Sequence, residues 1–204
     1  MDAGNKNLRE NVMKLNNKYY ILRHGEAKSN AKGIVSCLPE KFKNPLTRKG
    51  ASQIKSAVDK LINKNINLIF ASPLLRTTQT AEIVGKALKI KIKSDKRLRE
   101  IGFGIFNSKS VKSFEKYFKS SQERVKRKVP GGENYEEVLK RVFSFLAEID
   151  KKYKDKNILI VSHQAPLLLL SGKVKGYSIL KSIKSINNIF GEKRIAKGEL
   201  IELN

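Results

Sequence analysis

Short apolar runs alternate with amphipathic stretches along the chain, and this alternation predicts an α/β protein. We expect strands at residues 18–23, 67–71, 90–94 and 157–162, and a C-terminal pair at 185–190 and 195–203. Apolar residues at helical spacing predict helices at 52–63, 74–88 and 135–153. Because helices and strands alternate, we predict a three-layer α/β/α sandwich with a mainly parallel central sheet.

No repeat or linker divides the sequence. We expect a polar N-terminal extension over residues 1–17 and a single domain over residues 18–204. The segment 103–129 is the least regular and the most basic. We predict that it forms a helical insertion or cap over the functional site.

The apolar runs are far shorter than the ~20 residues that a membrane helix needs, so we expect no membrane partner. The N-terminus lacks the ~7–15-residue apolar core of a secretory signal. The single cysteine, Cys37, cannot form an internal disulfide, which suits a reducing compartment. We therefore expect a cytoplasmic protein; the sequence leaves its oligomeric state open.

The chain carries a formal net charge of +24. Such a charge is typical of proteins with an anionic partner such as nucleic acid. Here, however, 33 lysines outnumber 10 arginines, and the basic residues are scattered without an aromatic-interleaved stripe. We interpret the charge as a compositional lysine bias and expect no specific nucleic acid. The electropositive surface would still attract phosphorylated substrates.

The chain has only two histidines, and each directly follows an apolar run that is predicted to be a buried strand. His24 follows the first strand and His163 follows the strand at 157–162. In an open parallel sheet, ligands bind beyond the carboxyl ends of the strands, so the two imidazoles can meet at one edge. Imidazole transfers protons and can act as a covalent nucleophile near neutral pH.

Three further side chains converge on the same edge. Arg23 precedes His24, and Gly25 is expected to let backbone N–H groups approach an anion. Arg76 lies near the start of a helix that follows the strand at 67–71, and a helix N-terminus favours anions. Glu100 lies in a turn flanked by glycines. Together with the histidines, these residues form a set that could hold a phosphoryl group and transfer it.

The sequence resembles the histidine phosphatase superfamily, in its phosphoglycerate-mutase-like branch. The resemblance covers about residues 18 to 170, and its elements occur in the order of the family. They are Arg23-His24-Gly25-Glu26 with Asn30, Asn44-Pro45-Leu46-Thr47-Arg48-Lys49-Gly50, residues 72–81, Leu98-Arg99-Glu100, Pro130-Gly131-Gly132-Glu133 and Val161-Ser162-His163.

The resemblance implies a role for each matched residue. His24 would be the nucleophile that takes the phosphoryl group. Arg23, Arg76 and His163 would bind the phosphoryl oxygens and stabilise the transition state, and Asn30 would add a hydrogen bond. Glu100 would protonate the leaving alkoxide and then deprotonate the attacking water. The resemblance implies neither a metal nor a cofactor, because the cationic side chains supply the positive charge.

The sequence departs from the family at positions that bear on the substrate. Ala27 replaces a serine that is common in mutases, and Gln164-Ala165 after the second histidine resembles the phosphatase members, notably fructose-2,6-bisphosphatase. Residues 105–108 replace a Trp-Glu-Gly-like element. We therefore predict a metal-independent phosphomonoester hydrolase that acts on a phosphorylated small molecule through a phosphohistidine. The alternatives are a phosphoglycerate mutase with the same site and, from another class, a phospho-ligand or polyanion-binding protein.

Overall fold

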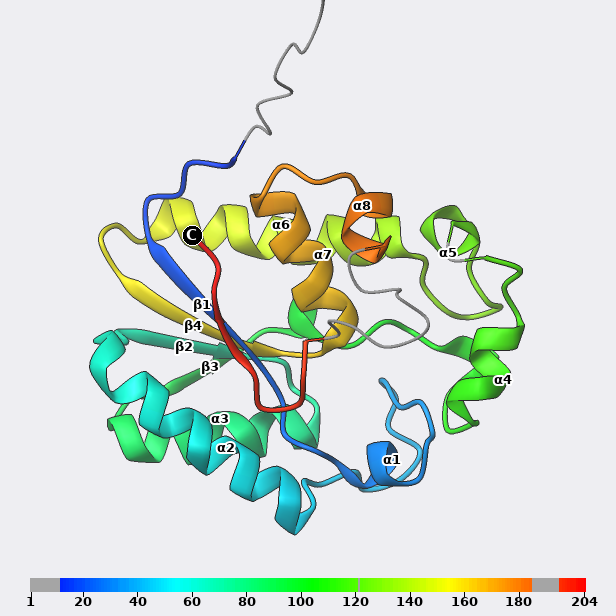
Figure 1. The fold of residues 1–204 in the computed structure, drawn as a ribbon, viewed down its shortest axis with the longest axis horizontal. Helices are drawn as coiled ribbons and strands as arrows, with labels where there is room; N and C mark the ends of the chain where they lie inside the picture. The colour runs from blue at the N-terminus through cyan, green and yellow to red at the C-terminus, as the bar shows by residue number, and fades with distance from the viewer. Residues whose placement is uncertain (1–11, 121, 185–194) are drawn as a thin grey trace, which may run out of the picture.

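A computed structural model describes residues 12–120, 122–184 and 195–204 (Figure 1). Five strands form one sheet in the order β3-β2-β4-β1-β5. All neighbours are parallel except β5, which runs antiparallel to β1. The strands are β1 (Lys18–Arg23), β2 (Leu68–Ala71), β3 (Ile92–Ser94), β4 (Asn157–Ser162) and β5 (Leu200–Glu202).

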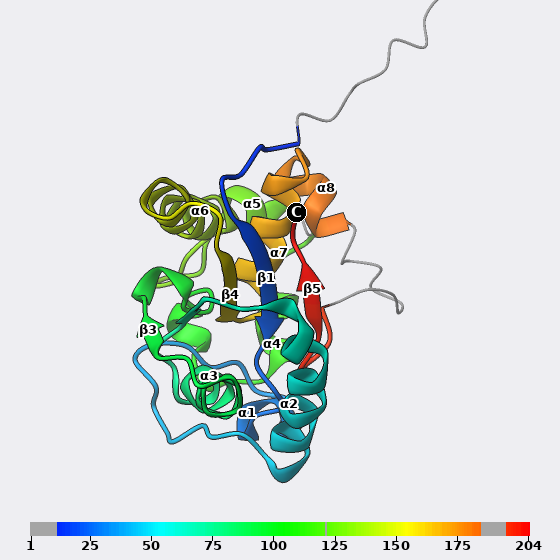
Figure 2. The same cartoon turned by 90° about the vertical axis from the view of Figure 1, so that its left-hand side faces the viewer.

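Helices cover both faces of the sheet, which confirms the predicted three-layer α/β architecture (Figure 2). Tyr19 and Ile21 of β1 pack toward α6 (Tyr135–Lys152) and α7 (Gln164–Val174). Tyr20 and Leu22 pack on the other face, toward α2 (Arg48–Leu61) and α3 (Leu75–Leu88). Successive residues of a strand point to opposite faces, so a strand covered on both sides is apolar throughout.

The predicted elements agree with the structure, with shifts at their ends. The predicted bounds of β1 and β4 are confirmed, whereas β2, β3 and β5 are shorter than predicted. Helix α2 begins at Arg48, ahead of the predicted residue 52, because the Thr47 hydroxyl accepts a hydrogen bond from the backbone of Gly50 and caps the helix. The predicted strand at 185–190 lies outside the described residues.

Helix α7 is absent from the sequence prediction. Its residues from Ala165 to Leu170 are all buried, so the segment has no polar face. Periodicity identifies a helix through the contrast between its two faces, and a helix buried on all sides lacks that contrast. The short helix α8 (Ile179–Lys184), which packs against α7, was also missed.

The segment 103–129 forms short helices at the rim of the site, as predicted. It contains η3 (Gly104–Phe106), α4 (Val111–Lys116) and α5 (Glu123–Lys126). Edge-to-face aromatic contacts join it: the ring of Phe114 lies 5.0 Å from that of Phe103 and 5.4 Å from that of Phe118. Three further short helices are α1 (Lys28–Ala31), η1 (Ile62–Lys64) and η2 (Lys96–Leu98).

The described end of the N-terminal extension contacts the domain. The Asn17 amide donates to the Asp150 carboxylate at 3.1 Å and to the Tyr153 carbonyl at 2.7 Å. Asn16 also binds Asp150 through its backbone N–H and its side chain. The last residues of the extension are therefore tied to the domain, while residues 1–11 lie outside the description. None of the helices in the described ranges has the length and apolar character needed to cross a membrane.

Candidate active site

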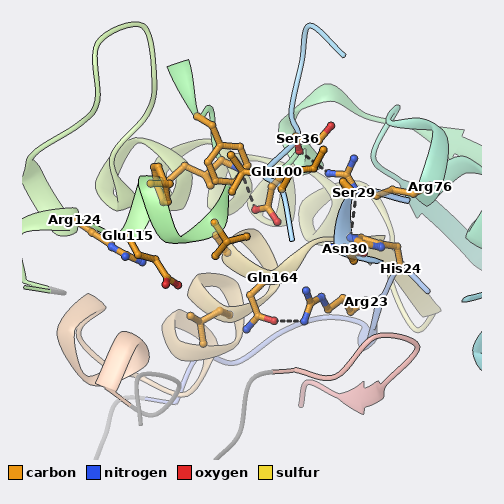
Figure 3. Close-up of a pocket in the computed structure, with 18 of the residues that line it drawn as sticks. Arg23, His24, Ser29, Asn30, Ser36, Arg76, Glu100, Glu115, Arg124 and Gln164 are labelled. Atoms are coloured by element: carbon orange, nitrogen blue, oxygen red, sulfur yellow. Dashed lines mark hydrogen bonds between the residues drawn. The ribbon is translucent and has the colours of Figure 1, made fainter. Parts of the chain in front are cut away.

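A cavity of about 180 Å³ opens at the carboxyl edge of the sheet (Figure 3). Five of the six predicted site residues line it: Arg23, His24, Asn30, Arg76 and Glu100. Parallel pairing brings the two histidines together, because Arg23 of β1 stands opposite Ser162 of β4. His24 and His163 directly follow these two neighbouring strands, so they lie side by side at the same edge of the sheet.

His24 is buried in a state that suits a nucleophile. Its Nδ1 lies 2.7 Å from the Gly25 carbonyl oxygen, which can only accept, so Nδ1 carries the hydrogen. The lone pair is then on Nε2, which accepts a hydrogen bond from Nε of Arg76 at 3.2 Å. Burial, with the charges of Arg76 and Arg23, lowers the pKa of His24 well below its usual value. The imidazole is consequently neutral at physiological pH.

Arg76 is held from several sides at the start of α3. Its side chain is only 3% exposed, and it donates to the Ser36 carbonyl at 2.9 Å. Glu40 forms an ion pair with it at 3.2 Å and also accepts from the backbone of Leu75 at 3.4 Å. Because both partners are fixed by the fold, the guanidinium is aimed at His24 before any ligand arrives.

Arg23 supplies a second guanidinium whose charge acts on His24. Its Nη1 donates to Oε1 of Gln164 at 2.5 Å and to the Ile195 carbonyl at 2.6 Å. Gln164 is the first residue of α7, so the N-terminus of that helix lies at the cavity. The partial positive charge of a helix N-terminus adds to that of the arginines.

His163 is buried next to His24 and is not among the residues that line the cavity. Its ring is fully buried, 5.1 Å from the ring of His24, and its Nε2 lies 2.8 Å from the Ser72 hydroxyl. Burial, with the charges of Arg76 and His24, lowers the pKa of His163 well below its usual value. Its Nδ1 has no hydrogen-bond partner among the residues that the structure describes.

Glu100 is held by a clamp formed by Glu133 and Arg141. Arg141 donates to the backbone carbonyls of Arg97, Arg99 and Glu100 at 2.5, 2.8 and 3.1 Å. The Glu133 carboxylate accepts from Arg141 at 2.9 and 3.0 Å, and it also accepts from the backbone of Gly102 at 2.9 Å. The turn is thus tied on both sides of Glu100, which fixes where its carboxyl group enters the cavity.

The structure gives a packing reason for glycine at position 25. Its N–H donates to the Thr80 hydroxyl at 3.3 Å. Glycine is required because the chain after β1 touches the start of α2. A Cβ at Gly25 would lie 2.4 Å from the Gly50 carbonyl oxygen, and one at Gly50 would lie 2.0 Å from that of Glu26. Two glycines of the motifs therefore permit one close backbone contact.

Asn30 lines the cavity while its Oδ1 accepts from the Ala27 backbone at 2.9 Å, which leaves the amide N–H groups as donors. Ser36 also lines the cavity, and its buried hydroxyl has no hydrogen-bond partner within the described ranges. Sequence reasoning missed Ser36, Glu40 and Arg141. These residues carry no local signal, because only the fold brings them to the motif residues.

Comparison with known proteins identifies the same family that the sequence motifs resemble. Residues 19–185 match the family model of the histidine phosphatase superfamily (branch 1). A relative from Salmonella choleraesuis (strain SC-B67), named "Probable phosphoglycerate mutase GpmB", is 30% identical over 162 residues, which cover 77% of this chain and 74% of the relative.

Solved structures share the fold. YhfR from Bacillus stearothermophilus has a TM-score of 0.75 at 23% identity and covers 90% of this chain and 89% of its own. A mycobacterial glucosyl-3-phosphoglycerate phosphatase with bound VO3 has a TM-score of 0.76 at 20% identity and covers 91% of each chain. The alpha-ribazole phosphatase of Shigella flexneri has a TM-score of 0.73 at 24% identity and covers 90% of this chain and 88% of its own. The chain belongs to the histidine phosphatase superfamily, branch 1.

Proposed function

We propose that this protein hydrolyses phosphomonoesters through a covalent phosphohistidine on His24. The observation that carries the proposal is the state of His24: a neutral imidazole whose Nε2 lone pair points at a buried guanidinium. Such an arrangement places an uncharged nucleophile where the negative charge of a phosphoryl group is stabilised.

In the first step, Nε2 of His24 attacks phosphorus and the bond from phosphorus to the ester oxygen breaks. Protonated Glu100 gives its proton to the departing alkoxide. Arg23 and Arg76 offset the charge that spreads over the phosphoryl oxygens. The Gly25 carbonyl, 2.7 Å from Nδ1, stabilises the positive charge that develops on the ring.

In the second step, water attacks the phosphohistidine and Glu100 takes a proton from it. The bond from phosphorus to Nε2 breaks, orthophosphate forms, and His24 returns to its neutral state. The ligand-free contact between Arg76 and His24 must exchange for a contact to a phosphoryl oxygen. We propose that Nδ1 of His163 and the Asn30 amide supply further hydrogen bonds to the phosphoryl group.

A mutase is the second candidate, and the name of the Salmonella relative favours it. A mutase keeps the phosphoryl group on the enzyme and returns it to a second oxygen. Incubation with 3-phosphoglycerate, with and without 2,3-bisphosphoglycerate, separates the two functions. We expect free phosphate to be released; rapid formation of 2-phosphoglycerate with negligible phosphate would assign a mutase and leave the residue roles intact.

The covalent step is tested with His24→Ala. We expect this variant to lose turnover, whereas Arg76→Ala and His163→Ala each lower the rate by about 10²–10³, since each removes one electrostatic contact. Wild-type protein given phosphorus-labelled substrate should retain a label that is labile in acid and stable in base. Substantial turnover by His24→Ala, with circular dichroism confirming its fold, would refute the mechanism.

We also infer a small phosphorylated substrate and a cytoplasmic location. The first is supported by the named substrates of the solved phosphatases, glucosyl-3-phosphoglycerate and alpha-ribazole phosphate. The second is supported by Cys37, the single cysteine of the chain, whose thiol is buried and donates to the Glu100 carbonyl at 2.9 Å. Burial raises the pKa of this thiol to about 12, which keeps it protonated.

A further inference from the structure

The cavity extends beyond the phosphoryl-binding residues into an apolar chamber. Its wall includes Phe103 from the turn after Glu100, Val111 and Phe114 from α4, Leu168 from α7 and Ile183 from α8. In contrast, the polar groups around His24 all lie at one end, as Figure 3 shows. A substrate whose phosphoryl group reaches His24 therefore places the rest of its alcohol against hydrophobic side chains.

One cationic side chain stands at the far end of this chamber. Arg124 of α5 lines the cavity on the side opposite to Arg23 and Arg76 (Figure 3). Its guanidinium lies over the rings of Phe114 and Phe118, 5.4 and 5.2 Å from their centres, and these contacts fix its position. Its Nε is buried and has no acceptor in the part of the chain that the structure describes.

Because Arg124 lines the cavity, its guanidinium can donate to an acceptor that a ligand brings to this end. Glu115 lines the same end of the cavity, so this end carries one acidic and one basic side chain, and their opposite formal charges give a second anion no net attraction. Arg124 is thus matched to a carbonyl or amide oxygen of the ligand. The apolar wall between the two ends leaves a short, highly charged acid such as phosphoglycerate without partners for its carboxylate.

We propose that the substrate is the phosphomonoester of a ring-sized apolar alcohol that carries a neutral oxygen acceptor at its far end. This inference rests on the proposed function for the chemistry at His24, but it concerns the opposite end of the cavity. Burial of a ring-sized group is worth about 10- to 100-fold in affinity, and a hydrogen bond from a charged donor adds about 10-fold.

Phosphonates test the inference by binding alone, because the carbon that replaces the ester oxygen prevents turnover. Calorimetry would compare 2-phenylethylphosphonate, its 4-carbamoyl derivative, and 2-hydroxy-4-phosphonobutanoate, which is the phosphonate counterpart of 3-phosphoglycerate. We expect the phenyl compound to bind at least about 10-fold more tightly than the phosphonobutanoate, and the carbamoyl group to add about 10-fold. Equal or tighter binding of the phosphonobutanoate would overturn the proposal.

The variant Arg124→Met keeps the stem of the side chain and removes the donor. We expect it to abolish the advantage of the carbamoyl group and to leave the affinity for inorganic phosphate unchanged. Lys126→Met is the matched control: it removes one charge from the same helix at an exposed position outside the cavity. A carbamoyl advantage that persists in Arg124→Met, or one that is lost equally in the control, would overturn the role of Arg124.

A separate measurement keeps the two proposals distinguishable. Phosphate release from p-nitrophenyl phosphate, by wild type and by His24→Ala, tests the hydrolase function without reference to the chamber. Absence of release, together with the expected order of phosphonate affinities, would refute the hydrolase and support the binding inference. Release together with a reversed order of affinities would do the opposite.

Discussion

Arg141 offers a sharp test of how the fold positions the proposed acid. This residue of α6 donates a hydrogen bond to the backbone carbonyl of Glu100, at 3.1 Å, and this bond acts on the catalytic carboxyl group through the geometry of the turn. The substitution Arg141→Met removes the hydrogen bonds to three carbonyls and to Glu133 while it keeps an aliphatic stem. The catalytic side chains themselves are left unchanged.

The cost in stability follows from the contacts that are lost. Each carbonyl left without a donor costs about 1–3 kcal/mol, and we take the lower limit because water can enter the space that the guanidinium leaves. Glu133 keeps Arg99, at 2.6 Å, and the Gly102 N–H, at 2.9 Å, so its carboxylate remains paired. The Glu100 carbonyl keeps the Cys37 thiol as a donor, at 2.9 Å, so only the carbonyls of Arg97 and Arg99 lose theirs. We therefore expect the free energy of unfolding, measured in urea, to fall by about 2 kcal/mol.

The cost in rate depends on the substrate. A displacement of about 1 Å at a catalytic group costs about 10²-fold, but only where that group is needed. Alkyl phosphates need a proton from Glu100 as the alkoxide leaves, so their first step should slow by about 100-fold. The p-nitrophenolate ion leaves without a proton, and its burst in stopped-flow absorbance should stay within a few-fold of wild type.

The controls separate positioning from general damage to the fold. Glu100→Gln should show the same dependence on the leaving group, more strongly. Lys140→Met removes the same charge from the neighbouring, exposed position of α6 and should change neither rate. Equal slowing of the alkyl and p-nitrophenyl substrates by Arg141→Met, or no slowing of either, would refute the positioning role.

Three further outcomes are expected. Both buried histidines stay neutral in the folded protein, whereas in the unfolded chain they bind protons below about pH 6.5, so stability is lost as the pH falls. Between pH 7.5 and 5.5 the free energy of unfolding should fall by about 1.4 kcal/mol for each histidine, or about 2.7 kcal/mol in total. Denaturant titration of a His24→Gln/His163→Gln variant should not show this loss. Phosphatase activity should survive EDTA and be inhibited by vanadate; loss on chelation that zinc or magnesium restores would contradict a metal-independent site. Binding to duplex DNA, followed by fluorescence anisotropy, should be weak, indifferent to sequence and steeply lost with salt, and tight binding to a defined sequence at ~0.15 M salt would contradict the lysine-bias interpretation.

The positions of the candidate catalytic residues along the chain could be predicted from the sequence, because the signals for them are local. An apolar run followed by Arg23-His24 or by His163 indicates a strand end that carries an imidazole, whatever lies elsewhere in the fold. The rule that parallel strands bind ligands at their carboxyl edge then brings the residues together. For the same reason β1, β4 and α6 were predicted within a residue or so, whereas α7, buried on all sides, has no periodicity to recognise.

Only the tertiary structure decided the state and the surroundings of those residues. The neutrality of His24 depends on burial and on a guanidinium from α3, and the position of Glu100 depends on Arg141 from α6. The packing reason for glycine at position 25 was not visible in the sequence, because the partner that requires it, Gly50, belongs to another segment. The apolar chamber and Arg124 combine side chains from α4, α5, α7 and α8, and the sequence does not show which of these side chains meet. Such features arise from contacts between distant segments, and a local pattern contains no information about which segments will meet.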